Sequence, residues 1–199
     1  MIKIGAVILA AGLARRMGQQ KLLLPLEGKP LLAHVLARVA QIPFSHTIAV
    51  IGEPRLQLEA LCQDYGIRSI YNSNSLQGQS TSMKLGLSQL PPDLGGFMFL
   101  QGDQPLLSAN LLERLIYCFH EHPKAIIVPS YKGEYRSPAL FGALWQGELE
   151  KIDGDRGGRS VIKNHLQAVI PVEWDEEESF WDTDTQEDYE RLVRRGCDV

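Results

Sequence analysis

The sequence predicts an α/β protein in three layers, with a mainly parallel sheet between two layers of helices. Short apolar runs that are typical of buried strands alternate along the chain with amphipathic helical patterns. At 199 residues the chain has the length of one such domain. Because no internal repeat, low-complexity tract or long Pro/Gly/Ser linker divides it, we expect residues 1–199 to form a single domain.

The first half of the chain should supply three strands and two helices. The apolar run within residues 3–9 predicts the first strand, and Pro30 suits the first position of a helix because its missing N–H is not needed there. That helix carries an apolar stripe typical of a core-facing side. A second strand is expected at residues 47–51, a helix from Pro54 and a weaker strand at residues 69–71.

The middle of the chain contains the longest polar loop of the sequence. Residues 72–80 form this loop, and the hydroxyls from Ser80 onward suit the start of a helix. A fully apolar strand follows at residues 97–100. Ser108 should cap a helix with a strongly apolar face, and residues 125–129 read as the next strand.

The last third is expected to contain a hairpin, a strand and two helices. Residues 131–141 have the pattern of a hairpin with its turn at Lys132-Gly133, and a short helix should begin near Ser160. A late strand is expected at residues 168–172, and a final helix should start at Thr185. The four consecutive carboxylates between them are typical of a solvated loop.

Composition excludes several classes of protein. The chain is 44% hydrophobic and 22% charged, which is ordinary for a globular protein. Its net charge of −4 argues against nucleic acid or an anionic membrane as the main partner. The three cysteines lack metal-site spacing, and neither a signal peptide nor a membrane-spanning run is apparent. We therefore expect a cytoplasmic protein that binds a small anion.

The segment from residue 5 to residue 21 is the strongest functional signal. A buried strand runs into three small residues, and three cations follow within one loop; these are Ala10, Ala11, Gly12, Arg15, Arg16 and Lys21. Accessible backbone N–H groups beside cations suit a polyanion such as a nucleoside triphosphate. The segment is neither a Walker A loop nor a Rossmann fingerprint. A tight turn with solvated cations is the structural alternative.

A second signal lies after the apolar strand at residues 97–100. Asp103 follows that strand directly, at the edge of the sheet where open α/β proteins bind ligands. One or two carboxylates together with substrate phosphates commonly hold Mg²⁺. An aspartate that only forms a turn before Pro105 is the alternative.

These motifs together resemble a known family. Leu9-Ala-Ala-Gly12, Arg16-Met-Gly18 and Lys21 resemble the entry loop of the nucleotidyltransferases with a Rossmann-like, GT-A-type fold. The match is closest to the MocA-like molybdenum cofactor cytidylyltransferases, relatives of MobA. Members of that branch usually have a serine where this chain has Ala14, so one hydroxyl contact is missing.

The resemblance implies roles for particular residues. Nucleotide-binding residues would be Leu9, Ala10, Ala11, Gly12, Leu13, Gly78, Ser80 and Ser82. Arg16 and Lys21 would neutralise the phosphates, and Asp103 with Asp184 would hold Mg²⁺. Acceptor-binding residues would be Arg136, Pro138, Asp155 and Arg159.

Several of these roles compete with simpler structural ones. Residues 80–82 could act as a helix cap as well as a ligand contact. Residues 153–159 fit a solvated loop as well as a phosphate site, and Thr185 with Asp188 fits a capping box. Of the carboxylates at 182 and 184, we expect one to face the metal and favour Asp184.

The resemblance implies transfer of CMP from CTP to the phosphate of a molybdopterin-type cofactor, with release of pyrophosphate. Guanylyl-transferring relatives usually have glycine at the place of Ala11, and the added methyl group narrows the base pocket. A GTP-using enzyme, or a cytidylyltransferase for a sugar or polyol phosphate, stays an alternative. So does a non-catalytic protein that delivers cofactor. A molybdoenzyme or its chaperone is the expected protein partner.

Overall fold

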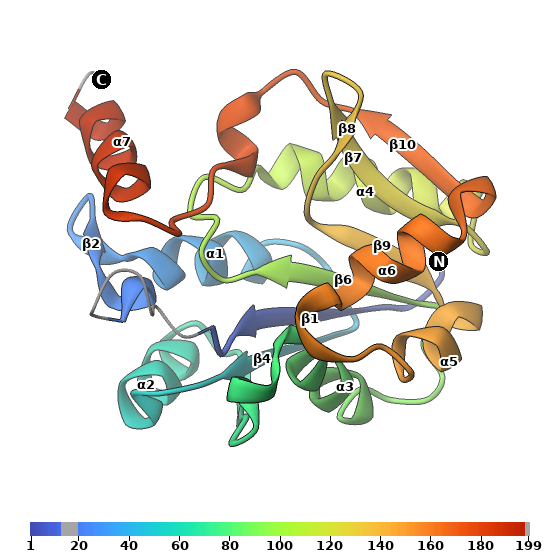
Figure 1. Cartoon of the computed structure of the whole chain (residues 1–199), viewed down its shortest axis with the longest axis horizontal. Coiled ribbons are helices and arrows are strands. Elements are labelled where there is room, and N and C mark those ends of the chain that lie inside the picture. Colours follow the sequence, from blue (N-terminus) through green and yellow to red (C-terminus); the bar gives the residue numbers. More distant parts are fainter. Residues whose placement is uncertain (13–19, 198–199) are drawn as a thin grey trace.

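The computed structural model describes residues 1–12 and 20–197, and these residues form an eight-stranded sheet with helices on both faces (Figure 1). The spatial order is β10-β7-β9-β6-β1-β4-β5, with β8 added to β7. The strands are β1 (Ile4–Ala10), β4 (His46–Ile51), β5 (Arg68–Tyr71), β6 (Gly96–Gln101), β7 (Ile126–Tyr131), β8 (Glu134–Tyr135), β9 (Ala139–Gly142) and β10 (Val169–Glu173). The predicted three-layer α/β fold with a mainly parallel sheet is confirmed.

The sheet departs from parallel pairing at β9. This strand lies between β6 and β7 and is antiparallel to both, whereas β6, β1, β4 and β5 are parallel neighbours and β10 is parallel to β7. The predicted hairpin is present, since β8 pairs with β7 around Lys132 and Gly133, which have φ of 51° and 78°. The chain then continues from this hairpin into the centre of the sheet.

Helices cover the two faces of the sheet and enclose two apolar cores. One face packs against α1 (Leu31–Ala40), α2 (Arg55–Asp64) and α4 (Ala109–Glu121). The other packs against α3 (Gln79–Ser88), α5 (Gln146–Leu149) and α6 (Gly157–Asn164). Strand β1 is buried along its whole length, which explains its unbroken apolar sequence. No helix among the described residues is long and apolar enough to cross a membrane.

The predicted helix starts are close to those observed, with two informative shifts. Pro30 and Pro54 each lie one residue before their helix. Helix α3 begins at Gln79, so Ser80 lies within its first turn, and Gly78 is the cap residue. Helix α6 begins at Gly157, three residues before the predicted start. Both shifts lengthen a helix toward a glycine at which the chain turns sharply.

A small third core joins the C-terminal helix to the start of the chain. Helix α7 (Gln186–Cys197) packs on the short hairpin of β2 (Pro25–Leu26) and β3 (Lys29–Pro30), and the two lie side by side in Figure 1. Buried Leu26, Leu31 and Leu192 form this core. The Tyr189 hydroxyl also donates a hydrogen bond to the Pro25 carbonyl at 2.6 Å. This core fixes two chain segments that reach the candidate site.

Candidate active site

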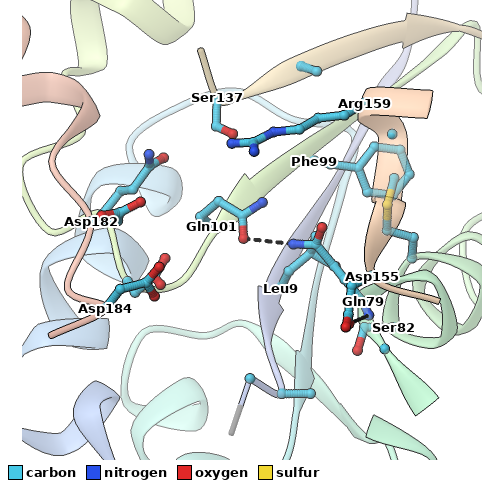
Figure 2. A pocket seen from close by; sticks show the side chains of 18 of the residues that line it. Leu9, Gln79, Ser82, Phe99, Gln101, Ser137, Asp155, Arg159, Asp182 and Asp184 are labelled. Atoms are coloured by element: carbon cyan, nitrogen blue, oxygen red, sulfur yellow. Dashed lines mark hydrogen bonds between the residues drawn. The ribbon is translucent and has the colours of Figure 1, made fainter. Parts of the chain in front are cut away.

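A cleft of about 1060 Å³ opens at the carboxyl ends of β1 and β6 (Figure 2). Its walls come from the start of α3, the β8–β9 connection, α6 and the segment before α7. Ligands of open α/β sheets bind at this edge, because parallel strands end there together and leave room between the following loops. The cleft brings together most of the predicted site residues.

The alternation of β1 decides which residues of the entry loop reach the cleft. Leu9, Ala11 and Gly12 line it, whereas the Ala10 side chain packs into the core on the opposite face. Leu13 and Arg16, also predicted to contact the nucleotide, lie outside the described residues. The Gln20 side-chain amide donates to the Glu53 carbonyl, which anchors the chain just before Lys21.

The structure places the residues of the predicted nucleoside loop differently from one another. Gly78 and Ser82 line the cleft, and the Ser82 hydroxyl accepts a hydrogen bond at 2.9 Å from the Asn72 side chain. Ser80 is buried and is not among the described residues that line the cleft, so its nucleoside contact stays a prediction. On the first turn of a helix, positions two apart point in different directions, and this separates Ser80 from Ser82.

Gly78 is the point at which two distant loops meet. Its φ of +109° favours glycine, and a Cβ at this position would lie 2.4 Å from the Gly154 carbonyl carbon. The adjacent Gln79 N–H donates to the Asp155 carboxylate at 3.3 Å. Asp155, which was predicted to bind the acceptor, contacts the loop that ends at Gly78 and Gln79. It also lines the cleft.

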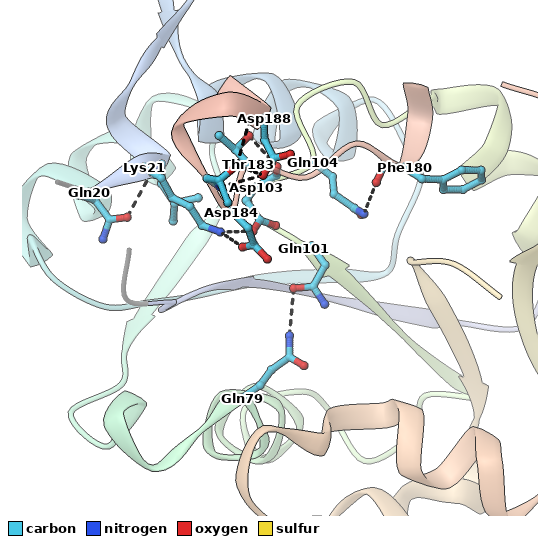
Figure 3. Close-up of polar contacts among 12 residues, drawn as sticks. Gln20, Lys21, Gln79, Gln101, Asp103, Gln104, Phe180, Thr183, Asp184 and Asp188 are labelled. Atoms are coloured by element: carbon cyan, nitrogen blue, oxygen red, sulfur yellow. Dashed lines mark hydrogen bonds and ion pairs between the residues drawn. The ribbon is translucent and has the colours of Figure 1, made fainter. Parts of the chain in front are cut away.

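A buried lysine and three aspartates line the cleft beyond the carboxyl ends of β1 and β6, and Figure 3 shows Lys21 between Asp103 and Asp184. Lys21 is 8% exposed, and its Nζ lies 2.5 Å from Asp103 Oδ2 and 2.7 Å from Asp184 Oδ1. Asp182 and Asp184 both line the cleft, and Asp184 is the one that pairs with Lys21, so the expectation that Asp184 faces a metal stays a prediction. Residues two apart in an extended segment lie on the same side of the chain.

The pKa shifts follow from this concentration of charge. Burial by itself lowers the pKa of Lys21, but the Asp103 and Asp184 carboxylates outweigh that effect and raise it above its ordinary value. The pKa of Asp182 is also raised, first by burial and then by repulsion from Asp103, Asp184 and Asp188. Lys21 therefore stays charged at neutral pH, and the Asp182 carboxyl is harder to ionise than an ordinary aspartate.

Hydrogen bonds fix the segment that carries Asp182 and Asp184 relative to Asp103. The Thr183 hydroxyl donates to the Asp103 carbonyl at 3.4 Å, and the Gln104 amide donates to the Phe180 carbonyl at 3.2 Å (Figure 3). The predicted capping box at the start of α7 is confirmed, since the Thr185 N–H donates to Asp188 at 2.8 Å and the Asp188 N–H donates to the Thr185 hydroxyl at 3.2 Å.

The donor set fits a hard divalent cation that also binds phosphate. Among the described residues no cluster of three or more His, Cys, Asp or Glu forms a complete metal cage. Asp103 and Asp184 nevertheless already surround one positive charge, the Lys21 ammonium. Mg²⁺ typically takes one or two carboxylates and completes its shell with water and substrate phosphates. The arrangement therefore suits a cation delivered with a nucleotide.

The other end of the cleft carries positive charge. Arg159 and Lys163 both line it, four residues apart on one side of α6. Arg136 lines the cleft as well and pairs with Glu134 at 2.6 Å. Pro138 is not among the described lining residues, although its neighbours Ser137 and Ala139 are. Lys163 was missed from the sequence, and its spacing from Arg159 on a predicted helix was the available signal.

Two glutamines between the ends of the cleft were also missed. Gln79 Nε2 donates to Gln101 Oε1 at 3.0 Å (Figures 2 and 3), and both residues line the cleft. Gln101 lies two residues before Asp103, but nothing in the sequence indicated its contact with a residue 22 positions away.

Comparisons with known proteins identify the family of the chain. Residues 6–169 match the MobA-like NTP transferase domain. The purine catabolism protein PucB of Bacillus subtilis is 30% identical, over 96% of this chain and 95% of that protein. A probable molybdenum cofactor guanylyltransferase of Thermococcus kodakarensis is also 30% identical, over 96% and 94%. Rv0371c of Mycobacterium tuberculosis, solved in complex with manganese, superposes with a TM-score of 0.83 at 26% identity, covering 96% of this chain and 98% of that chain.

Proposed function

Because the chain belongs to the MobA-like NTP transferase family, we propose that it transfers CMP from CTP to the phosphate of a molybdopterin-type cofactor and releases pyrophosphate. The observation that carries the proposal is a cleft with a carboxylate–lysine group at one end and the cations of α6 at the other. Such a cleft can hold a triphosphate and a second phosphate ester facing each other.

The carboxylate end fits the nucleotide. Asp103 and Asp184 would hold Mg²⁺, which when bound neutralises the triphosphate and makes its α-phosphorus more electrophilic. Lys21 has an ammonium group that stays protonated, and it lies where it can pair with a phosphate oxygen instead of a carboxylate. The residues at the end of β1 would let the phosphates approach the backbone closely.

The chain's contribution to catalysis is positioning and charge. An acceptor phosphate oxygen forms a bond to the α-phosphorus of CTP, the bond from that phosphorus to the bridging oxygen breaks, and pyrophosphate leaves with the electron pair. The ionised acceptor phosphate already carries its nucleophilic oxygen, so no residue needs to remove a proton. Arg159 and Lys163 would hold this anion in line with the leaving group.

Ala11 supports CTP as the substrate. Its buried methyl group lines the cleft at the end of β1, where it narrows the space for a base. A GTP-using enzyme is the second candidate, because a relative of 30% identity carries the name of a guanylyltransferase. The cationic end of the cleft suits any phosphate acceptor, so acceptor identity has to be tested directly.

Pyrophosphate release tests the proposal. Purified protein with Mg²⁺ and molybdopterin cofactor receives CTP, GTP or ATP in parallel, and Asp103→Asn serves as the inactive variant. We expect release with CTP, reduced at least about 10²-fold in the variant. If pyrophosphate is released with GTP alone, the substrate is GTP instead of CTP, and the proposed mechanism is unchanged. CTP binding without release, for this acceptor and for sugar phosphates, would indicate a delivery protein.

A further inference from the structure

A hydrogen bond between two glutamine side chains crosses the floor of the cleft. Gln101 ends β6 on the same sheet face as Phe99, two residues before Asp103. Gln79 projects from the first residue of α3, and its Nε2 donates to Gln101 Oε1 at 3.0 Å. The bond therefore lies where the carboxylate end of the cleft meets the end that carries Arg159.

Gln79 is held in place from two directions. Its backbone N–H donates to Asp155 at 3.3 Å. Its Oε1 lies over Gly157, where a Cβ would approach it to 2.4 Å and where φ is +51°. Glycine at position 157 thus leaves the room that the Gln79 amide occupies. The donor that orients Gln101 is fixed by packing as well as by its hydrogen bond.

The bond uses the oxygen of Gln101 and leaves its nitrogen available. No side chain or carbonyl among the described residues accepts from Gln101 Nε2. Figure 2 shows this nitrogen turned away from Gln79 and from the Asp182–Asp184 side of the cleft. Gln101 thus presents two N–H donors to the cleft in a fixed direction, without a charge.

We propose that Gln101 donates a hydrogen bond to the acceptor phosphate and that Gln79 is the positioning residue that aims it. This inference rests on the proposed function, because it assigns a residue to the acceptor of that reaction. Two anions have to approach each other here. A carboxylate at position 101 would repel both of them, whereas an oriented neutral donor stabilises an anion without needing to reorient.

Gln101→Glu is the decisive variant. It keeps an oxygen to accept from Gln79, so the bridge stays, but it replaces the N–H donors by a charged oxygen. We expect acceptor affinity to fall about tenfold or more, the size of a lost hydrogen bond to a charged group. CTP affinity should change by less than about threefold. Gln79→Met removes this hydrogen bond but keeps the Gln101 donors, so it should lower acceptor affinity less than Gln101→Glu does.

Calorimetric titration reads these affinities without turnover. Molybdopterin cofactor is titrated into protein saturated with Mg²⁺ and a non-hydrolysable CTP analogue, and the analogue is titrated separately. Gln63→Glu on the exposed side of α2 supplies the same charge change away from the cleft. Gln101→Met replaces the glutamate variant if the latter does not fold, and a loss of acceptor affinity is expected there too.

The outcomes separate the inference from the proposed function. Unchanged acceptor affinity in Gln101→Glu, or an equal loss for CTP, would overturn the inference. If acceptor affinity fell more in Gln79→Met than in Gln101→Glu, the hydrogen bond between the two glutamines would have only a structural role. This result would also overturn the inference. A wild type that binds both ligands but releases no pyrophosphate contradicts the proposed function, while the titrations still decide the role of Gln101.

Discussion

Lys21 lies between Asp103 and Asp184, at 2.5 and 2.7 Å from their oxygens, in the position that we propose for a divalent cation. We expect Lys21→Met to bind Mn²⁺ more tightly in the absence of nucleotide, because the competing ammonium is gone. Pyrophosphate release should nevertheless fall about 10²-fold or more, since a charge that stabilises the transferring phosphates is lost. Mn²⁺ binding followed by electron paramagnetic resonance, together with turnover, checks both.

Lys3→Met is the matched control for this prediction. Lys3 also pairs with an aspartate at 2.5 Å, but both side chains are 59% exposed and lie far from the cleft. Exposed pairs contribute little, so neither metal binding nor turnover should change. Weaker Mn²⁺ binding in Lys21→Met would contradict the prediction, because it would show that the lysine holds the aspartates in place for the metal.

The ionised side chain of Asp182 lowers the stability of the folded protein. Its pKa is raised in the fold by burial and by neighbouring carboxylates, so the folded state holds this proton more tightly than the unfolded chain. Stability is therefore lost as pH rises through and above the ordinary aspartate range near 3.8. Asp182 is an exposed residue, so solvent screens much of this effect, and Asp182→Asn should raise Tm at pH 7 only slightly.

The pH dependence distinguishes this mechanism from a general packing effect. The gain in Asp182→Asn should shrink as the pH is lowered toward 4, where the wild-type carboxyl also becomes neutral. Thermal unfolding of both proteins between pH 4 and pH 8 measures the difference. A gain that is constant over this range would mean that charge at residue 182 is not its cause.

Helix α7 acts at the scale of an element, because it carries Asp184 at its entrance and packs on the hairpin that follows Lys21. Leu192→Ala should open a cavity in the small core of Leu26 and Leu31, at a cost of about 2–4 kcal/mol. The freed helix should also displace Asp184, so kcat/KM falls at temperatures where the protein is still folded. Unfolding curves and kinetics measure the two effects.

Leu58→Ala provides the comparison, since Leu58 is fully buried on α2 in a large core away from the site. Its stability loss should be similar, while kcat/KM at a temperature well below Tm should stay near the wild-type value. Equal kinetic losses in the two variants would show that α7 has no particular role in positioning the aspartate.

The elements themselves were largely predictable, and the exceptions have a common cause. Apolar runs located β1 and β6, and the capping pair at Thr185 and Asp188 located the start of α7. The insertion of β9 between β6 and β7 was not predictable, because four apolar residues after a hairpin fit several pairings equally well. Strand order depends on non-local packing that local patterns do not encode.

For the whole molecule, the sequence predicted the part of the cleft formed by strand ends better than the part formed by loops. Leu9 and Asp103 were predictable because both follow parallel strands whose carboxyl ends meet. The contact of Gln79 with Gln101 and the place of Asp155 depend on how loops distant in sequence dock, and only the folded chain shows them. The assigned contacts of Leu13 and Arg16 stay predictions.

The cations of α6 in the cleft are opposite in sign to the net charge of the molecule. The chain carries a net charge of −4, yet Arg159 and Lys163 place two cations at one end of the cleft. We expect Arg159→Gln with Lys163→Gln to raise KM for the acceptor about tenfold or more, because two charged donors to a phosphate are lost. KM for CTP should change little, since the proposed nucleotide site is at the opposite end.

The salt dependence of KM distinguishes direct binding of the acceptor by Arg159 and Lys163 from attraction by the overall electrostatic field of the protein. In the wild type, KM for the acceptor should rise as ionic strength increases, because added ions screen these cations from the phosphate. In the double variant this dependence should be much flatter. Lys3→Gln with Lys151→Gln removes the same charge from exposed positions and should keep the wild-type slope. If both double variants lost the slope equally, net charge would steer the acceptor, and α6 would have no specific part in binding it.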